Sequence, residues 1–415
     1  MRIDSQSRVD AGEHDGRATV PSDQHWQPTA NDERYVTLDV LRGLALFGVL
    51  LINLQTLFRV SLFEHILHFH TDPGTWNRVV DVLLAGLLET KAVSLFSLMF
   101  GIGSAIQAER AAARGVNVTR FLVRRYLVLL ALGLGHLLLI WNGDVLVLYA
   151  VCGLLIVPFL RLSASMLAVL GAAAIALRSV VDLPVPFPDA YAMQAQAVAA
   201  THVYGSGNFM DILAFRSRET GRFIVPLLVG ILPQTAGLML CGIAAWRSGL
   251  LREPERHKRL LTVIFAGSLA VGATATSLQV FSDSTGRTLA INEGLLRLCS
   301  FIPLAFSYAA GLLLWMTPPR VTRVSALFAS LGQMALTNYL TESVVLSVIF
   351  YGFGFGLFGR LGSAPAVLIG IALYIGQLFF SRLWLRHYRF GPVEWLWRSL
   401  TYGRWQPMRG GKSDI

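Results

Sequence analysis

Apolar residues gather into long segments along this chain rather than alternating with polar ones. Windows of about twenty apolar residues recur from Leu38 to Trp384, each long enough to cross a bilayer as an α-helix. We count about ten: 38–60, 82–107, 121–140, 145–161, 163–181, 223–246, 261–281, 294–316, 325–350 and 364–385. A membrane β-barrel would show alternating segments of about ten residues, which are not seen. The pattern predicts an all-α, polytopic membrane bundle of about ten transmembrane helices.

Composition and charge agree with this class. Hydrophobic residues make up 54% of the 415 residues and charged residues only 14%, against roughly a quarter charged in average soluble domains. The formal net charge is +10, but Lys and Arg gather in short connections after alternate segments and in the C-terminal tail. This distribution follows the positive-inside rule, so we expect no nucleic-acid partner. It predicts an even number of spans with both termini in the cytoplasm.

Three further regions flank or interrupt the spans. Residues 1–33 are polar, mixed in charge and without a signal-peptide pattern, which predicts a disordered cytoplasmic leader. The transmembrane domain extends over 34–385 and includes an extracytoplasmic segment, 182–222, with one or two amphipathic helices on the outer face. Residues 386–415 mix Trp, Tyr and Arg, which is typical of helices at headgroup level. We therefore expect a cytoplasmic interfacial tail with a short helix.

Ionisable residues inside spans are the first functional candidates, because they are costly in a bilayer. Arg125 marks the cytoplasmic end of the third span, and His136 lies eleven residues further on, ~16 Å deeper at the helical rise. Arg42 and Asn53 repeat this spacing on the first span. Asn53 and His136 are therefore expected at similar depth, near the middle of a hydrocarbon core ~30 Å thick. A histidine and an amide at that depth can bind a polar ligand together.

A second group of charges belongs to the outer ends of the spans. Lys91 and Glu89 lie near the outer end of the second span, and Asp144 opens the fourth. Asp144 has two structural interpretations, an ion pair with Lys91 and an N-cap of the fourth helix. The functional alternative is that the Asn-Gly corner before Asp144 breaks the helix. Asp144 would then fold back and orient His136 as a general base.

The remaining polar residues carry weaker signals. Asn338 and Glu342 lie near the middle of the ninth span. Their side chains are equally consistent with lining a cavity and with packing between helices. The histidines of EHILHFH (64–70) are not followed by further zinc-type ligand spacing, and the cysteines lie inside apolar spans, so no metal is expected. Glycine-rich spans fit a homo-oligomer as well as close packing within one chain.

Several stretches resemble the YeiB-like family of bacterial inner-membrane proteins. They are LDVLRGLALFGVLLIN (38–53), LFSLMFGIG (95–103), GHLLLIWNGDVLVLYAVCG (135–153), GQMALTNYLTES (332–343) and FGPVEWLWRSLTYGRWQPM (390–408). The last is similar to the end of the domain of unknown function 418. The resemblance covers nearly everything from Arg34 to Arg409 and implies a multi-pass protein of the bacterial inner membrane.

The YeiB-like family is in turn distantly similar to transmembrane acyltransferases. Those enzymes take an acyl group from cytoplasmic acyl-CoA and deliver it to a sugar on the far side of the membrane. The resemblance implies that Arg42 lies at the cytoplasmic entrance and that a mid-membrane histidine, here His136, is the catalytic base. The O-acyltransferases carry a histidine on their first helix, whereas this chain offers Asn53. Glu342 stands where YeiB-like proteins usually have Gln.

These observations define an acyl-transfer hypothesis. The phosphates of acyl-CoA (acetyl-CoA) would meet Arg42, Arg124 and Arg125, with the thioester near His136. His136 would deprotonate a hydroxyl or amine on a small-molecule or glycan acceptor arriving from outside. Asn53 or Lys91 would stabilise the oxyanion, and Asp144 would orient His136 or hold the acceptor. The substrate cavity would further involve Lys91, Glu89, Asn338 and Glu342.

Two other classes of function remain open at this point. A transporter or exporter of a small polar metabolite would use the same buried groups as a substrate site. Pro233-Gln234 and the glycine-rich stretch 352–359 favour it, because both can interrupt helices. A membrane scaffold without a ligand would need His136 only for stability.

Overall fold

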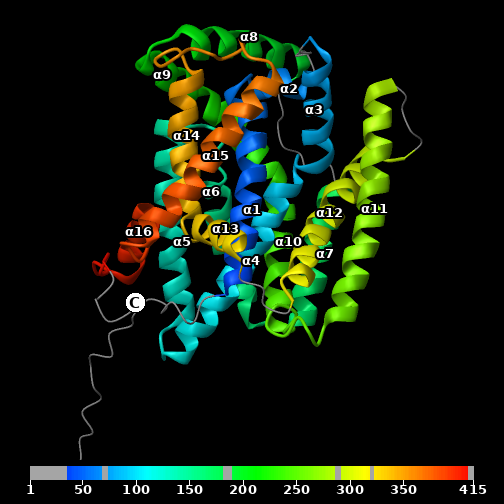
Figure 1. The fold of residues 1–415 in the computed structure, drawn as a ribbon, viewed down its shortest axis with the longest axis vertical. Helices are drawn as coiled ribbons and strands as arrows, with labels where there is room; N and C mark the ends of the chain where they lie inside the picture. The colour runs from blue at the N-terminus through cyan, green and yellow to red at the C-terminus, as the bar shows by residue number, and fades with distance from the viewer. Residues whose placement is uncertain (1–34, 68–72, 181–188, 286–290, 318–321, 410–415) are drawn as a thin grey trace, which may run out of the picture. The chain divides into compact units, whose positions relative to one another are not determined.

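The structure is a computed structural model that describes residues 35–67, 73–180, 189–285, 291–317 and 322–409. Within these ranges the regular structure is helical, with no β-strand beyond one isolated bridge between Tyr388 and Arg409. Figure 1 shows the helices packed side by side as a bundle. The predicted all-α, polytopic class is therefore confirmed.

Six helical segments are long and apolar enough to cross a membrane. They are α1 (Val36–Asn53) continued by the π-helical η2 (Leu54–Phe58), α5 (Val118–Gly135) continued by the π-helical η3 (His136–Ile140), α10 (Val225–Arg247), α11 (Lys258–Thr285), α12 (Glu293–Trp315) and α15 (Ser363–Leu385). Their length and apolar composition, in a chain this poor in charge, indicate a multi-pass membrane protein.

Shorter or interrupted helices occupy the other predicted spans. The predicted span 82–107 is divided between α3 (Thr75–Leu87) and α4 (Lys91–Ala113), and 325–350 between α13 (Arg323–Gln333) and α14 (Ala335–Phe350). The predicted spans 145–161 and 163–181 correspond to α6 (Leu146–Ile156) with η4 (Val157–Arg161), and α7 (Ala164–Val180). The predicted count of about ten spans depends on including all of these segments.

The helix breaks lie elsewhere than expected. α10 continues through Pro233, and residues 352–359 lie in the connection between α14 and α15 rather than inside a helix. The interruptions are at Met334 and at Thr90, whose φ of 61° is left-handed. A threonine is strained in that conformation, which ends α3 and redirects the chain into α4.

Helix α1 lies at the centre of the bundle, in contact with α4, α12, α13, α14 and α15. Glycines allow the closest of these approaches. A Cβ added to Gly332 of α13 would lie 1.9 Å from the Asp39 carbonyl oxygen, and one on Gly43 would lie 2.3 Å from the Phe328 carbonyl oxygen. Lipid provides no hydrophobic force between helices, so such backbone contacts supply much of the association.

Gly332→Ala should therefore destabilise the protein. The added methyl group cannot fit against the α1 backbone, so α1 and α13 must separate, at a cost of about 1–3 kcal/mol. Thermal unfolding of the purified protein should begin at a lower temperature than in wild type. Gly376→Ala is the matched control, because nothing lies within 4 Å of its added Cβ. Equal unfolding temperatures for the two variants would contradict this account of the packing.

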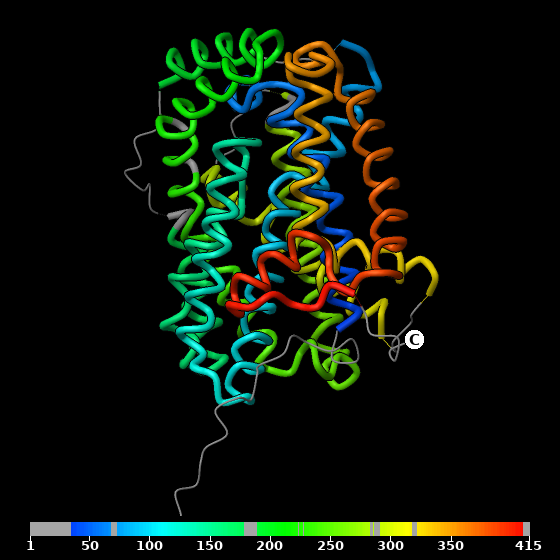
Figure 2. Tube along the Cα trace, turned by 90° about the vertical axis from the view of Figure 1, so that its left-hand side faces the viewer, coloured from blue at the N-terminus to red at the C-terminus, as the bar shows by residue number. Residues whose placement is uncertain are grey.

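Some helices lie across the bundle rather than along it (Figures 1 and 2). α8 (Ala190–Ser206) and α9 (Phe209–Glu219) cover one end, and α16 (Pro392–Tyr402) lies against α5 and α14. Helices are thus present in the 182–222 segment and in the tail, but α8 does not have the predicted amphipathic pattern, and the outer-face placement stays a prediction. The prolines of DLPVPFPD and the predicted leader, 1–33, lie outside the described residues.

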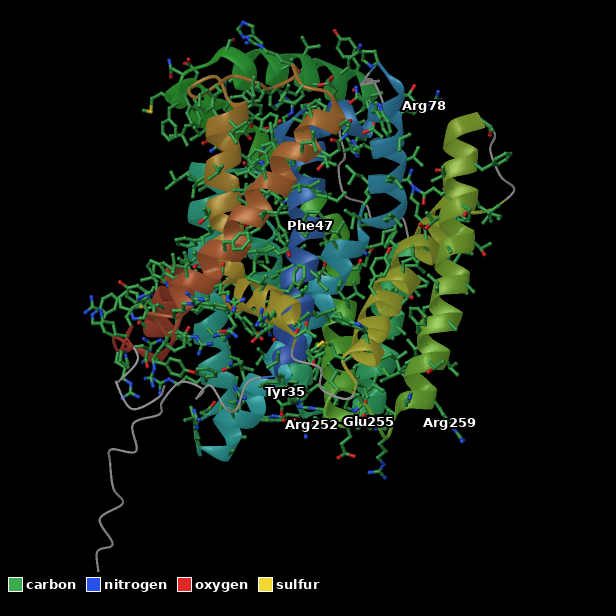
Figure 3. The ribbon with its side chains drawn as sticks, viewed as in Figure 1. Tyr35, Phe47, Arg78, Arg252, Glu255 and Arg259 are labelled. Carbon is green, nitrogen blue, oxygen red and sulfur yellow. The ribbon has the colours of Figure 1, made fainter. Side chains whose placement is uncertain are left out.

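Charged side chains mark the two ends of the bundle. Figure 3 places Arg252, Glu255 and Arg259 at the end opposite α8 and α9, with Arg78 at the other end and Phe47 between them. The basic connection between α4 and α5 lies at the same end as Arg252 (Figure 1). This arrangement is the one expected of helices that cross a membrane. The sidedness, with a cytoplasmic basic end, stays a prediction.

Candidate active site

A buried histidine–aspartate pair lies at the end of α5. His136 Nδ1 is 2.7 Å from Asp144 Oδ1, and the two side chains are 1% and 0% exposed. Their chain separation is bridged by a corner at Trp141–Asp144, where the backbone leaves the helix. The expectation that Asp144 folds back toward His136 therefore matches the geometry. A carboxylate on Nδ1 holds the imidazole in one orientation and leaves Nε2 free for chemistry.

Asp144 has a second task in the same corner. Its Oδ2 accepts a hydrogen bond of 2.7 Å from the Val147 N–H, which caps the first turn of α6. One of the two structural interpretations was an ion pair between Asp144 and Lys91. No such ion pair occurs in the part of the chain that the structure describes. Lys91 Nζ instead donates to the Ala85 carbonyl oxygen at 2.7 Å. Asp144 is consequently both a helix cap and the partner of His136.

Both predicted mid-membrane residues lie where an α-helix widens into a π-helix. Asn53 ends α1 immediately before η2, and His136 is the first residue of η3. π-Helical turns are rare and occur frequently at functional sites, because they move one side chain out of the regular helical register. Asn53 is 9% exposed, and no hydrogen bond joins it to His136 in the described part of the chain. The structure thus shows no direct contact between Asn53 and His136 among the described residues, and a joint site stays a prediction.

Aromatic rings surround the histidine. The Tyr339 ring centroid lies 5.2 Å from that of His136, and Trp141 lies 6.1 Å away. Trp141 stacks on Phe58 at 4.5 Å, and Phe58 lies 5.9 Å from Tyr351. The rings make the surroundings of the imidazole apolar, which strengthens electrostatic interactions at Nε2.

Several buried polar atoms have no hydrogen-bond partner among the described residues, and apart from Gln377 Oε1 on α15 they lie on η3 and the residue after it, or on α9, η5 and α14 with its end. We call them the unpartnered polar cluster: His136 Nε2, Trp141 Nε1, Arg216 Nε and Nη1, Thr220 Oγ1, Ser347 Oγ, Tyr351 OH and both carboxyl oxygens of Glu342. Buried polar groups are almost always satisfied in folded proteins. Exceptions on elements that contact η3, directly or through α9, indicate a place where a polar ligand or water completes the bonds.

The arrangement of α14 explains how this cluster forms. Tyr339, Ser343, Ser347 and Tyr351 follow one another at four-residue spacing, which places them in succession along one side of the helix. That helix contacts η3, and η3 also contacts α9, which carries Arg216. Sequence reasoning missed Ser347, Tyr351 and Arg216. The four-residue polar spacing in TNYLTESVVLSVIFY was the available signal for the first two.

A hydrogen-bond network joins α8 and α9 to the corner beside the pair. Glu219 Oε2 accepts from Tyr204 OH at 2.6 Å and from Asn142 Nδ2 at 2.5 Å, and Oε1 accepts from Gln196 Nε2 at 3.2 Å. Burial raises the pKa of Glu219, and the hydrogen bonds from Tyr204, Gln196 and Asn142 oppose that rise. Asn142 is thereby fixed two residues before Asp144, which holds the corner in place.

The other predicted cavity residues have different environments. Asn338 Nδ2 donates to Ser381 Oγ and to the Leu331 carbonyl oxygen, so its amide serves helix packing. Glu342 remains without a hydrogen-bond partner on either oxygen. Glu89 lies between α3 and α4 and pairs with His65 at 3.5 Å. Of these, Glu342 alone belongs to the unpartnered polar cluster.

Two of the three arginines predicted to meet acyl-CoA, Arg124 and Arg125, contact α16 or the residue just after it, and the third, Arg42, lies within electrostatic reach of Arg125. Arg125 is half-buried against the Trp397 ring, 3.7 Å from its centroid, and interacts electrostatically with Arg42 and Arg398. Arg124 packs against Gly403, just after α16. We call Arg42, Arg124, Arg125 and Arg398 the basic cluster. Arg42 is also bonded to Asp39 at 2.9 Å, and Arg398 was missed because the tail was interpreted as an interfacial anchor alone.

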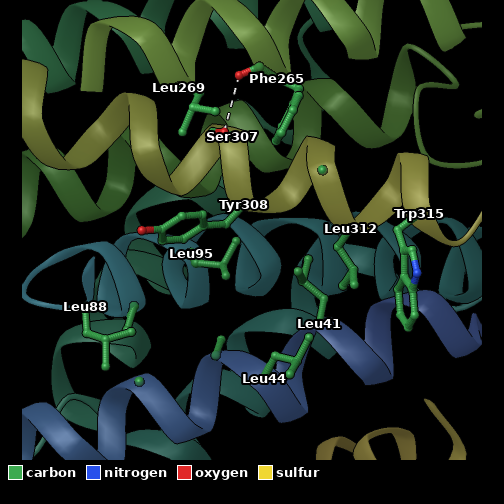
Figure 4. A pocket seen from close by; sticks show the side chains of 14 residues that line it. Leu41, Leu44, Leu88, Leu95, Phe265, Leu269, Ser307, Tyr308, Leu312 and Trp315 are labelled. Carbon is green, nitrogen blue, oxygen red and sulfur yellow. Dashed lines mark hydrogen bonds between the residues drawn. The ribbon is translucent and has the colours of Figure 1, made fainter. Parts of the chain in front are cut away.

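A separate pocket opens between α1, α4, α11 and α12 (Figure 4). It has a volume of about 500 Å³ and apolar walls, including Leu41, Leu95, Leu269 and Trp315. None of its lining residues belongs to the pair or to the unpartnered polar cluster. Such walls suit lipid tails rather than a reacting polar group, so we place the candidate active site at His136.

No cluster of three or more His, Cys, Asp or Glu side chains arranged to hold a metal ion occurs in the described ranges. His68 and His70 of the EHILHFH stretch lie outside those ranges. His65 faces Glu89.

Fold and site together define a multi-pass helical membrane protein with a buried histidine–aspartate pair. Comparisons with known proteins then give the family. The uncharacterized protein YxaH of Bacillus subtilis (strain 168) is 35% identical over 406 residues, covering 92% of this chain and 98% of YxaH. The uncharacterized protein YeiB of Escherichia coli (strain K12) is 28% identical over 389 residues, covering 89% of this chain and 96% of YeiB. The family model "Protein of unknown function (DUF418)" matches residues 245–404. This chain belongs to the YeiB-like DUF418 family, as its motifs predicted.

Proposed function

We propose that this protein is a transmembrane acyltransferase that moves an acyl group from acyl-CoA to a hydroxyl or amine acceptor on the other side of the membrane. The observation that carries the proposal is the buried His136–Asp144 pair, whose Nε2 has no partner among the described residues. A neutral imidazole held by a carboxylate is the usual general base of acyl transfer.

The chemical step follows from this geometry. The acceptor oxygen or nitrogen attacks the thioester carbonyl carbon while His136 Nε2 takes its proton. The tetrahedral intermediate collapses, the carbon–sulfur bond breaks, and the proton passes to the leaving CoA thiolate. Asn53 is our candidate donor to the oxyanion. Lys91 is a weaker candidate, because its ammonium group is already bonded to Ala85.

The basic cluster would hold the phosphates of CoA by charge-assisted hydrogen bonds. Arg125 and His136 lie eleven residues apart on the continuous path of α5 into η3, a rise of ~16 Å. An extended pantetheine arm can cover such a distance with its phosphates at Arg125 and its thioester near His136. The proposal therefore predicts a ligand that lies along α5.

The first test is binding and consumption of labelled acetyl-CoA by the purified protein in detergent. We expect saturable binding, slow release of CoA to water, and faster release with an acceptor that carries a suitable hydroxyl or amine. Absence of both binding and CoA release would contradict the proposal. Movement of a polar metabolite into proteoliposomes in the absence of CoA would favour a transporter instead.

Arg125→Gln should weaken acetyl-CoA binding by about 10- to 100-fold, the equivalent of one lost charge-assisted hydrogen bond. The turnover rate at saturating acetyl-CoA should change little, because Arg125 is remote from the reacting atoms. Arg259→Gln is the matched control: it removes the same charge at the basic end but away from α16 (Figure 3). Equal affinities in the two variants would remove the basic cluster from the proposal.

A further inference from the structure

Arg216 is the charged base in the unpartnered polar cluster, and its burial is not explained by contacts that stabilise the fold. Its side chain lies on α9 and is 1% exposed, and its Nε and Nη1 have no hydrogen-bond partner among the described residues. The guanidinium group lies 5.8 Å from the centroid of the Tyr351 ring. Cation–π attraction at that distance replaces only part of the lost hydration. A buried cation with unused donors is strongly unfavourable for a protein that binds nothing there.

The neighbouring carboxylate does not supply the missing bonds. Glu219 lies close enough to Arg216 for an electrostatic interaction, but no ion pair between them is present in the described part of the structure. The oxygens of Glu219 accept instead from Asn142, Tyr204 and Gln196. The guanidinium donors therefore remain available for an oxygen-rich anion, which is the group that arginine binds best.

We propose that Arg216 binds an anionic group, a carboxylate or a phosphate, on the acceptor molecule. This inference rests on the proposed acyl transfer and adds the chemical class of its acceptor. The Tyr351 hydroxyl and the Thr220 hydroxyl, both buried and without partners in the described ranges, are additional donors for the same group. The acceptor is thus recognised at Arg216 and reacts at His136.

The spacing of the two positions gives the acceptor its shape. Tyr339 lies against His136 and Tyr351 lies near Arg216, and these tyrosines are twelve residues apart on α14 and its end. Twelve residues correspond to at most about 18 Å along the helix axis. An acceptor that reaches both positions is elongated, with its nucleophile at one end and its anionic group at the other, as in an acidic oligosaccharide.

The test measures thermal unfolding of the purified full chain in detergent at constant chloride concentration. Inorganic phosphate and glucuronate are the two anionic probes, and glucose is the neutral control. We expect one or both anions, but not glucose, to raise the unfolding temperature of wild type, since a ligand that binds the folded state stabilises it. A shift with phosphate alone assigns a phosphate group, and a shift with glucuronate alone assigns a carboxylate.

Three variants identify the residue responsible. Arg216→Met should abolish the anion-dependent shift and, without anion, unfold no more readily than wild type, because it removes an unpaired buried charge. Arg216→Lys should retain part of the shift, since lysine keeps the charge but not the planar donors. Arg218→Met, an exposed arginine on the same helix, should keep the full shift.

Two results would overturn the inference. The first is a marked loss of stability in Arg216→Met without anion, which would make Arg216 a structural residue. The second is an equal anion-dependent shift in wild type and Arg216→Met, which would mean an adventitious ion only. An Arg216-dependent shift in a protein that never consumes acetyl-CoA would contradict acyl transfer while leaving the anion site in place.

Discussion

His136→Ala should lower acyl transfer by about 10²- to 10⁴-fold, the usual contribution of a general base. The imidazole Nε2 is the one ring nitrogen not engaged by Asp144, so nothing else in the pair can take the proton of the acceptor. The expected loss is in the turnover rate, measured as transfer of label from acetyl-CoA to the acceptor. Affinity for acetyl-CoA should change little, because the basic cluster binds the phosphates elsewhere.

The control separates chemistry from folding. His257→Ala changes the same side chain in the connection between α10 and α11, far along the chain from the pair, and should transfer label at the wild-type rate. Both variants should bind acetyl-CoA as wild type does. A His136→Ala protein that binds acetyl-CoA and turns over normally would show that the pair is structural, as the scaffold alternative requires.

Asp144→Asn should reduce turnover by a similar ~10²- to 10⁴-fold, but unlike His136→Ala it should also change how turnover depends on pH. The amide keeps the size of the carboxyl group but loses the charge that fixes the Nδ1–H tautomer and stabilises the imidazolium. The curve of turnover against pH should therefore change in position, in addition to the fall in the maximum turnover rate. Measurement of turnover against pH at saturating acetyl-CoA checks this.

Asp189→Asn is the matched control for the second task of Asp144. Asp189 caps α8 through the Ala192 N–H at 2.7 Å, as Asp144 caps α6, but it lies away from His136. Loss of a cap costs ~0.5–2 kcal/mol, so a small loss of stability can occur in either variant. A normal pH profile with reduced stability in Asp144→Asn would make Asp144 a cap and nothing more.

The sequence was sufficient to predict the helical class and to single out His136 and Asp144, which the structure brings together as the centre of the candidate site. Spans of apolar residues determine helices in lipid, because every backbone group must be satisfied within the segment. Depth along a helix follows from residue spacing, which is why Arg125 and His136 could be related in advance. The return of Asp144 to His136 was one alternative suggested by the Asn-Gly corner, and the sequence left a Lys91 pair and a helix cap equally open.

The remaining features depend on contacts between distant segments. Arg216 was not singled out in the predicted extracytoplasmic segment 182–222, and only the packing of α9 on η3 reveals that it is buried. Arg398 joins the basic cluster because α16 folds back onto α5. Asn338 was equally consistent with a cavity and with packing until Ser381 was seen beside it. The spacing of residues along one helix does not show which residues of other helices lie beside them.

The most direct test of the account is the sidedness of transfer in sealed proteoliposomes. Labelled acetyl-CoA is supplied on the side of the basic cluster, with the acceptor enclosed on the opposite side. The account predicts that acetylated acceptor accumulates on the acceptor side while CoA stays where it was supplied, and that His136→Ala abolishes this. Consumption of no acetyl-CoA, with unmodified acceptor crossing the membrane instead, would contradict acyl transfer and identify a transporter.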